Sequence, residues 1–211
     1  MAEKSIVLTT DRIDQESDEI KIIKAVRQNP EAFGELYGLY VEKVFRYLYS
    51  RIGNVHEAED ATSQTFLAAF ETFGRFRQDG HFASWLFTMA RNKAMDHFRE
   101  RKKSVSLDDV EEISAPGTRA PYRNRDYIAG TGTTSVDDPL YGVIQSEQSA
   151  ALSKLILALP EEDRELLRLR FLAGMSFPEI AYLLHRNEEA VKKSIYRLLA
   201  RLHSQMEVSN G

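Results

Sequence analysis

This chain of 211 residues contains no cysteine. The absence excludes disulfide bonds, thiolate metal ligands and a cysteine nucleophile, and it fits a reducing cytosol. Long apolar runs are absent as well: no apolar stretch approaches the length of about 20 residues that a helix needs to cross a membrane. The first residues also lack the apolar core of a secretory signal. We therefore expect a cytoplasmic protein with no membrane insertion.

The residue patterns that announce catalysis or metal binding are missing too. The five histidines are scattered, and none has the HExxH spacing of a zinc site. There is no glycine-rich phosphate-binding loop. Glu57, Glu59 and Asp60 could hold a cation in principle, but no second carboxylate cluster is spaced to complete its ligand shell. We expect neither enzyme activity nor a cofactor.

The formal net charge of −4 is unevenly distributed along the chain. Residues 1–19 carry a net charge of −4 and residues 104–149 one of −5. Residues 20–103 carry +4 and residues 150–211 carry +1. Since local patches decide electrostatic binding, the acidic whole-chain charge does not exclude a nucleic-acid partner.

Helical periodicity dominates what is present, and residues 82–103 show it most clearly. One face of this stretch holds apolar residues and a histidine at three- and four-residue steps: Phe82, Leu86, Met89, Ala90, Ala94, His97 and Phe98. Arg91, Asn92 and Asp96 lie on other faces. The stretch alone is compatible with a core helix that has a solvated polar face. It is equally compatible with a helix that binds phosphates and base edges.

Similar stripes predict an all-helical N-terminal domain over residues 19–103, after a flexible tail at 1–18. The expected helices before residue 82 are Glu19–Gln28, Glu31–Arg51 and Val55–Phe73. Asn29-Pro30 suits a helix start, and Asn54 with Glu57 resembles a capping box. Residues 74–81 read as a loop in which Phe76 is an exposed aromatic candidate.

Beyond residue 103, scattered glycine, proline, serine and threonine without an apolar period predict a flexible linker over 104–139. A second helical domain is expected over 140–206, followed by a tail at 207–211. Its first helices end at Leu159 and Leu172. The fold class is therefore all-α, with two small helical domains.

The last two helices have the sequence shape of a helix-turn-helix. Ser176 with Glu179 forms a capping box for a short helix over Phe177–Leu184, and Asn187 caps the longer one. In the long helix the expected buried stripe is Val191, Ile195, Leu198, Leu199 and Leu202. Lys192, Lys193, Arg197 and Arg201 are left outside, where they can neutralise phosphates or contact bases. An ordinary amphipathic helix is the simpler alternative.

Two motifs together resemble the extracytoplasmic-function (group four) sigma factors of bacterial RNA polymerase. HEAEDATSQTFLAAFETFGRFR, followed by FASWLFTMARNKAMDHFRERKK, is similar to region two of this family. LPEEDRELLRLRFLAGMSFPEIAYLLHRNEEAVKKSIYRLLARL is similar to region four. The resemblance implies a transcription initiation factor that binds core polymerase, recognises the minus-10 and minus-35 promoter elements and promotes melting. It also implies contacts with the β′ clamp and the β flap, and an anti-sigma factor as a partner.

The resemblance also implies roles for individual residues. Those that match the clamp-docking surface are Glu59, Asp60, Gln64 and Phe66. Those that match the minus-10 segment, with the basic helix end as phosphate contacts, are Phe76, His81, Arg91, Asn92, Asp96, Arg99, Arg101, Lys102 and Lys103. Those that match the minus-35 segment are Arg186, Lys192, Lys193 and Arg197.

The chain departs from the family pattern around the helix-turn-helix. The family has glycine and an apolar residue where this chain has His185-Arg186, and a non-glycine residue in a left-handed turn costs about 1 kcal/mol. The family's Thr-Val-Lys-Ser-Arg reads here as Ala190-Val191-Lys192-Lys193-Ser194. Because an arginine is lost, bidentate reading of guanine by that residue is lost, and we expect an atypical minus-35 preference.

Two rival functions remain open at this point. A conventional helix-turn-helix regulator would bind duplex DNA without polymerase, usually as a dimer. A sigma-like decoy would dock on polymerase without reading DNA. The match to region two and the linker argue against the first, whereas Ser194 and His185 give the second slight support.

Overall fold

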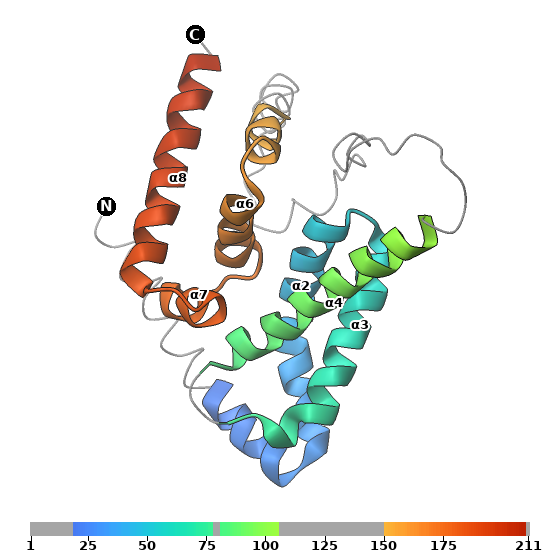
Figure 1. The fold of residues 1–211 in the computed structure, drawn as a ribbon. Coiled ribbons are helices and arrows are strands. Elements are labelled where there is room, and N and C mark those ends of the chain that lie inside the picture. The colour runs from blue at the N-terminus through green and yellow to red at the C-terminus, as the bar shows by residue number, and fades with distance from the viewer. Residues whose placement is uncertain (1–18, 78–80, 106–149, 210–211) are drawn as a thin grey trace, which may run out of the picture.

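The computed structural model describes residues 19–77, 81–105 and 150–209, with side chains described up to residue 101 in the second range and up to 207 in the third. These residues form helices and no strand, which confirms the all-α expectation. They make two bundles (Figure 1): the N-terminal bundle, residues 19–105, and the C-terminal bundle, residues 150–209. Most of the predicted linker lies outside the described residues. In the described part, no helix is both long and apolar enough to span a bilayer.

Local signals set the helix boundaries of the N-terminal bundle. Residues 19–28 are helical, and Asn29 then caps a 3₁₀ turn η1 (Pro30–Ala32). Helix α2 (Phe33–Ile52) ends at Gly53, which has the left-handed φ of 80°. Asn54 Oδ1 accepts a hydrogen bond from the backbone of Glu57 at 3.2 Å and starts α3 (Val55–Thr72). The 3₁₀ turn η2 (Phe73–Arg75) precedes α4 (Phe82–Val105).

The predicted apolar face of α4 is the core of this bundle. Phe82, Leu86, Ala90 and Ala94 are each 0% exposed. The Phe82 ring lies edge-on to Tyr40, with ring centroids 5.4 Å apart. Because α4 packs against both α2 and α3, this one stripe closes the bundle and leaves the polar side of α4 outside.

The C-terminal bundle starts with helical residues 150–157, followed by α6 (Glu161–Leu167). The sequence predicted one α-helix to Leu172, but its last turns are a π-helix, η3 (Arg168–Leu172). There the Ala173 N–H donates to the carbonyl of Arg168, five residues back. Arg170 donates to the Met175 carbonyl at 2.8 Å and lies over the Phe177 ring, which anchors the wide turn.

The helix-turn-helix matches its prediction closely. The complete Ser176–Glu179 capping box starts α7 (Phe177–Leu184). The Asn187 side chain accepts from the Glu189 N–H at 2.9 Å at the start of α8 (Glu188–Ser209). His185 ends α7 with φ 52° and ψ 44°, so the expected non-glycine residue in a left-handed turn is confirmed.

This turn supports a stability prediction. Replacing His185 with glycine should raise the stability of the C-terminal bundle by about 0.5–1 kcal/mol, because glycine adopts positive φ without a Cβ clash. The measurement is the urea midpoint followed by circular dichroism. As the control, His203→Gly places glycine inside α8 at an exposed position and should cost about 0.5–1 kcal/mol. A loss of stability in His185→Gly would contradict the argument.

Candidate nucleic-acid and polymerase interface

The outer face of α3 carries an acidic and polar patch. Glu59, Asp60 and Gln64 are exposed, as a docking surface requires. Phe66 is not available in the same way, because it is only 5% exposed and packs edge-on against Tyr37 at 4.8 Å. Its backbone belongs to the patch, but its side chain belongs to the core.

Two exposed apolar residues on this face were not predicted as part of the docking surface. Leu67 is 59% exposed and Phe70 is 49% exposed. Their signal was in the spacing, since Ser63, Leu67 and Phe70 follow one another at four and three residues on one face. The face therefore begins acidic and polar and ends apolar, which is a suitable composition for a protein partner.

Two acidic side chains near the start of α3 lie close to histidine rings. Glu57 lies 3.5 Å from His97 of α4, and Glu59 lies 3.5 Å from His56. Across the residues that the structure describes, no group of three or more metal-ligating side chains comes together.

The segment before α4 differs from its prediction. Phe76 was expected to be exposed, but it is only 7% exposed, with its ring centroid 5.0 Å from Trp85 and 5.5 Å from Phe82. Arg27 holds its backbone carbonyl at 2.8 Å. Helical spacing could not show this burial, because Phe76 lies outside the helix that holds its partners Phe82 and Trp85. His81 is half-buried and stacks on Tyr182 of α7, with centroids 4.3 Å apart.

The polar side of α4 presents Asn92, Asp96 and Arg99 on one exposed face, at steps of four and three residues. Arg99 Nη1 lies 3.4 Å from Asp96 Oδ1, which holds the two side chains together. Arg101 is exposed, and Lys102 and Lys103 lie in α4 with their side chains outside the described ones. Arg91 points differently: its Nε lies 3.9 Å from Glu165 of the C-terminal bundle.

The outer face of α8 is basic, as predicted. Lys193 and Arg197 are exposed, Lys192 is half-buried, and a shallow groove runs between Glu189, Lys192, Lys193, Tyr196, Arg197 and Ala200. Arg186, in the turn before α8, donates to Ser194 Oγ at 3.3 Å, so its guanidinium joins this face. Arg201 is tied to Asp163 at 3.1 Å.

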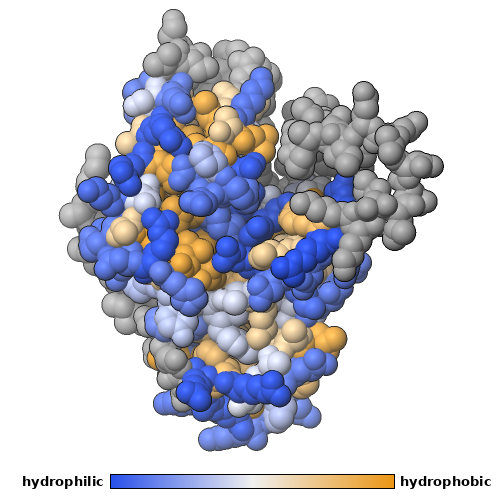
Figure 2. Space-filling view, viewed as in Figure 1, coloured by the Kyte–Doolittle hydropathy of each residue, from blue (hydrophilic) through white to orange (hydrophobic). Residues whose placement is uncertain are grey.

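One residue of the predicted buried stripe of α8 is misplaced. Val191, Ile195, Leu198 and Leu202 are buried, but Leu199 is 37% exposed. Tyr196 at 55% and Phe171 at 54% are also exposed on this bundle. Figure 2 shows orange apolar surface gathered over the α6 and α8 side of the molecule, beside blue polar side chains. The C-terminal bundle thus offers an apolar surface in addition to its basic one.

The chain matches two family models, one in each bundle. Residues 36–104 match sigma-70 region 2, and residues 149–202 match sigma-70 region 4. Both matches fall on the bundles that carry the acidic, polar and basic faces described above.

Curated relatives match across both bundles. The chain is 32% identical over 192 residues to the ECF RNA polymerase sigma factor BldN of Streptomyces coelicolor, covering 89% of this chain and 66% of that protein. It is 29% identical over 187 residues to the ECF RNA polymerase sigma factor SigW of Bacillus subtilis, covering 88% of this chain and 95% of SigW.

Solved structures share the fold. CnrH in complex with the cytosolic domain of CnrY aligns with a TM-score of 0.52 at 22% identity, over 90% of this chain and 97% of that one. The sigma factor RpoE, in complex with the anti-sigma factor NepR from Bartonella quintana, aligns with a TM-score of 0.53 at 20% identity, over 83% and 97%. The two region matches and the curated relatives together show that the chain belongs to the extracytoplasmic-function sigma factors of the sigma-70 family. It is therefore a transcription initiation factor that binds core RNA polymerase and promoter DNA, and not an enzyme.

Proposed function

We propose that three separate surfaces divide the work of initiation. The face of α3 that holds Glu59, Asp60 and Gln64 docks on the β′ clamp of core polymerase. Its acidic residues meet basic partners there, and the exposed Leu67 and Phe70 add apolar contact. Phe66 supports this surface from within the core.

The second surface is the polar side of α4, which binds the minus-10 element. Asn92 and Arg99 offer the amide and guanidinium groups that contact base edges, and Asp96 holds Arg99 in place. Arg101, Lys102 and Lys103 contact phosphates without reading sequence. His81 and Arg91 border the place where an unstacked base would be held, and Phe76 shapes it from beneath. Capturing such a base costs a few kcal/mol of stacking, which these contacts repay and which promotes melting.

The third surface is the basic face of α8, which enters the major groove at the minus-35 element. The observation that carries this assignment is the capped helix-turn-helix with Lys193 and Arg197 exposed on its second helix. Arg186 extends the face from the turn and Lys192 borders it. The apolar surface of this bundle would contact the β flap.

The regulation of this factor and its location in the cell are proposed from its partners. The structural relatives CnrH and RpoE were solved with CnrY and with the anti-sigma factor NepR. We assign an anti-sigma factor to this chain as well, with its exposed apolar surfaces as the binding sites. Because its partner is core polymerase, the factor works in the cytoplasm.

Reconstituted transcription on a random promoter library tests the proposal. Core polymerase with this factor should return minus-10 and minus-35 elements at a fixed spacing from the start site. The minus-35 preference should be atypical, because Ser194 cannot make the bidentate guanine contact of an arginine. Recovery of the usual family minus-35 consensus would contradict the expected preference. Specific binding of the isolated protein to duplex DNA in a gel shift, with no effect on polymerase, would favour a conventional regulator.

A further inference from the structure

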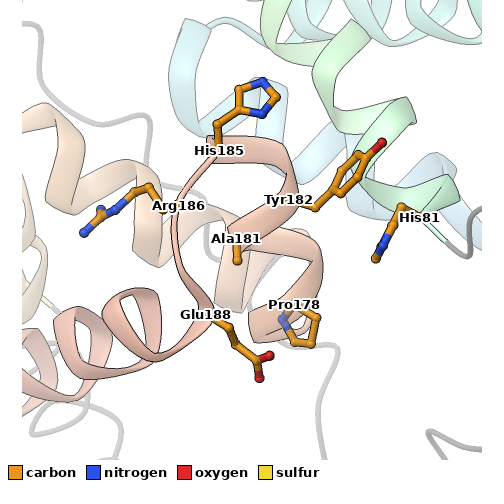
Figure 3. Close-up of a pocket in the computed structure, with 7 residues that line it drawn as sticks. All are labelled: His81, Pro178, Ala181, Tyr182, His185, Arg186 and Glu188. Carbon is orange, nitrogen blue, oxygen red and sulfur yellow. The ribbon is translucent and has the colours of Figure 1, made fainter.

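An arginine in the turn of the helix-turn-helix lies alongside the helix that follows it. Arg186 Nη2 donates to Ser194 Oγ at 3.3 Å, eight residues further along the chain. The side chain therefore runs past the first two turns of α8, and in a helix-turn-helix this half of the second helix enters the major groove. Figure 3 shows Arg186 extending away from His81 and Tyr182. Its charged end is thus carried to α8 and not to the contact between those two rings.

Two backbone hydrogen bonds fix the point from which this side chain starts. The His185 N–H donates to the Tyr182 carbonyl at 3.3 Å. The Arg186 N–H donates to the Ala181 carbonyl at 2.9 Å. This is the Schellman pattern, in which the residue after the left-handed one often makes an apolar contact back to the helix. Arg186 is exposed and makes its side-chain hydrogen bond forward to α8 instead, so the turn holds a guanidinium beside that helix.

The bond to Ser194 leaves the Arg186 guanidinium able to bind a base. Its five N–H donors form two forks of parallel donors, Nε with Nη2 and Nη1 with Nη2. Nη2 gives one hydrogen to each fork, so whichever hydrogen Ser194 accepts, the other fork stays complete. Among the described residues no ion pair occupies that fork, whereas Arg201 is held by Asp163 at 3.1 Å. Guanine offers the matching pair of acceptors, O6 and N7, at its major-groove edge.

Ser194 places this guanidinium at the border of the basic face of α8. It is half-buried and lies three residues before the exposed Arg197, on the same side of the helix. Positions 186 and 194 are also two of the departures from the family pattern, since arginine replaces an apolar residue at the first and serine replaces arginine at the second. We propose that Arg186, positioned by the Ser194 hydroxyl, reads a guanine of the minus-35 element through two parallel hydrogen bonds. The inference rests on the proposed binding of α8 to that element.

A phosphate contact is the alternative role for an exposed arginine. Such a contact needs only charge, whereas a bidentate guanine contact needs the planar fork. The bond to Ser194 favours the base contact, because it holds Arg186 along the half of α8 that enters the groove and lowers the side-chain entropy lost on binding. The backbone of Arg186 lies before α8 and not within it. It therefore reaches a different base pair from an arginine at position 194, in keeping with an atypical preference.

The experiment is the promoter-library selection, carried out with the full chain and core polymerase. The parent should prefer guanine at one minus-35 position by about five- to 100-fold, the range for a bidentate contact. In Arg186→Lys this preference should fall below about twofold, because lysine keeps the charge but lacks the fork. The slope of log affinity against log salt should stay that of the parent, since no charge is lost.

Two further variants test the role of Ser194. Ser194→Ala removes the hydrogen-bond acceptor and should lower the same guanine preference by about two- to tenfold, with the other base preferences unchanged. Arg186→Leu combined with Ser194→Arg moves the guanidinium into α8. This double variant should regain a preference for guanine, but at a different position of the element. A merely structural role of Arg186 would not produce that shift.

Arg201→Lys is the matched control, because it makes the same change in an arginine of α8 that is tied to Asp163. It should keep every base preference of the parent. An unchanged guanine preference in Arg186→Lys would overturn the inference. So would a uniform loss of affinity for all sequences in Arg186→Leu, which is the result for a phosphate contact. A library that returns no minus-35 element would overturn the proposed role of α8, and this inference with it.

Discussion

Reversing the charge of two residues on α8, Lys193→Glu with Arg197→Glu, is expected to lower transcription from a two-element promoter by at least about 100-fold. Both side chains are exposed, and both line the shallow groove on the outer face of α8. The change removes two cations that the proposal places against DNA phosphates and adds two anions, which the DNA backbone repels. A 100-fold loss corresponds to about 2.7 kcal/mol, which is reasonable for two lost cationic contacts together with repulsion.

The measurement is run-off transcription with core polymerase, repeated over a range of salt concentrations. Neutral Lys193→Ala and Arg197→Ala should each reduce the slope of log affinity against log salt by about 1, as expected for one phosphate contact apiece. Affinity for core polymerase should not change, because the proposed clamp-docking face lies on α3 and neither Lys193 nor Arg197 belongs to the apolar surface that is proposed to contact the β flap. That last result distinguishes a DNA defect from a general loss of assembly.

The control places the same kind of charge on the same helix, outside the groove. His203→Glu with Gln205→Glu alters two exposed positions near the end of α8 and should leave transcription within about twofold of the parent, since surface changes away from a binding site have small effects. Equal loss in both double variants would show that bulk charge matters and not this face. Retained activity in the Lys193/Arg197 variant would contradict the assignment of α8 to the minus-35 element.

The features that sequence reasoning predicted well are those whose cause is local. The Ser176–Glu179 capping box and the Asn187 cap depend on residues within three positions of one another, whereas the left-handed turn at His185 was expected from the family resemblance. The apolar stripe of α4 was likewise readable, because helical spacing alone places Phe82, Leu86 and Ala90 together.

The features that were missed depend on partners outside the residue's own helix or turn. Phe76 looks like an exposed loop aromatic until Phe82 and Trp85 fold around it. Glu165 looks like one acidic residue among several at a helix start, and only the tertiary structure brings it to Tyr47, which is 118 residues away in the sequence. Sequence periodicity shows that a face is buried, but it does not show which distant residue covers it.

The second large effect concerns the residue at the start of α4. Phe82→Ala should destabilise the N-terminal bundle by about 3–5 kcal/mol, the range for removing a phenylalanine from a well-packed core. Phe82 is 0% exposed and lies against the rings of Tyr40, Phe73, Phe76 and Trp85. Because these rings come from α2, from the η2 turn with the residue that follows it, and from α4 itself, no single neighbour can move to fill the cavity.

A loss of this size is a large part of the free energy of unfolding of a typical domain, which is about 5–15 kcal/mol. Urea denaturation followed by circular dichroism should show the loss. Phe171→Ala is the control: that ring is 54% exposed, and its removal should cost less than about 1 kcal/mol. Transcription should fall together with stability and recover partly at lower temperature, since Phe82 itself contacts neither DNA nor polymerase in the proposal. A stable Phe82→Ala variant that is inactive would instead show that the ring acts directly at the minus-10 element.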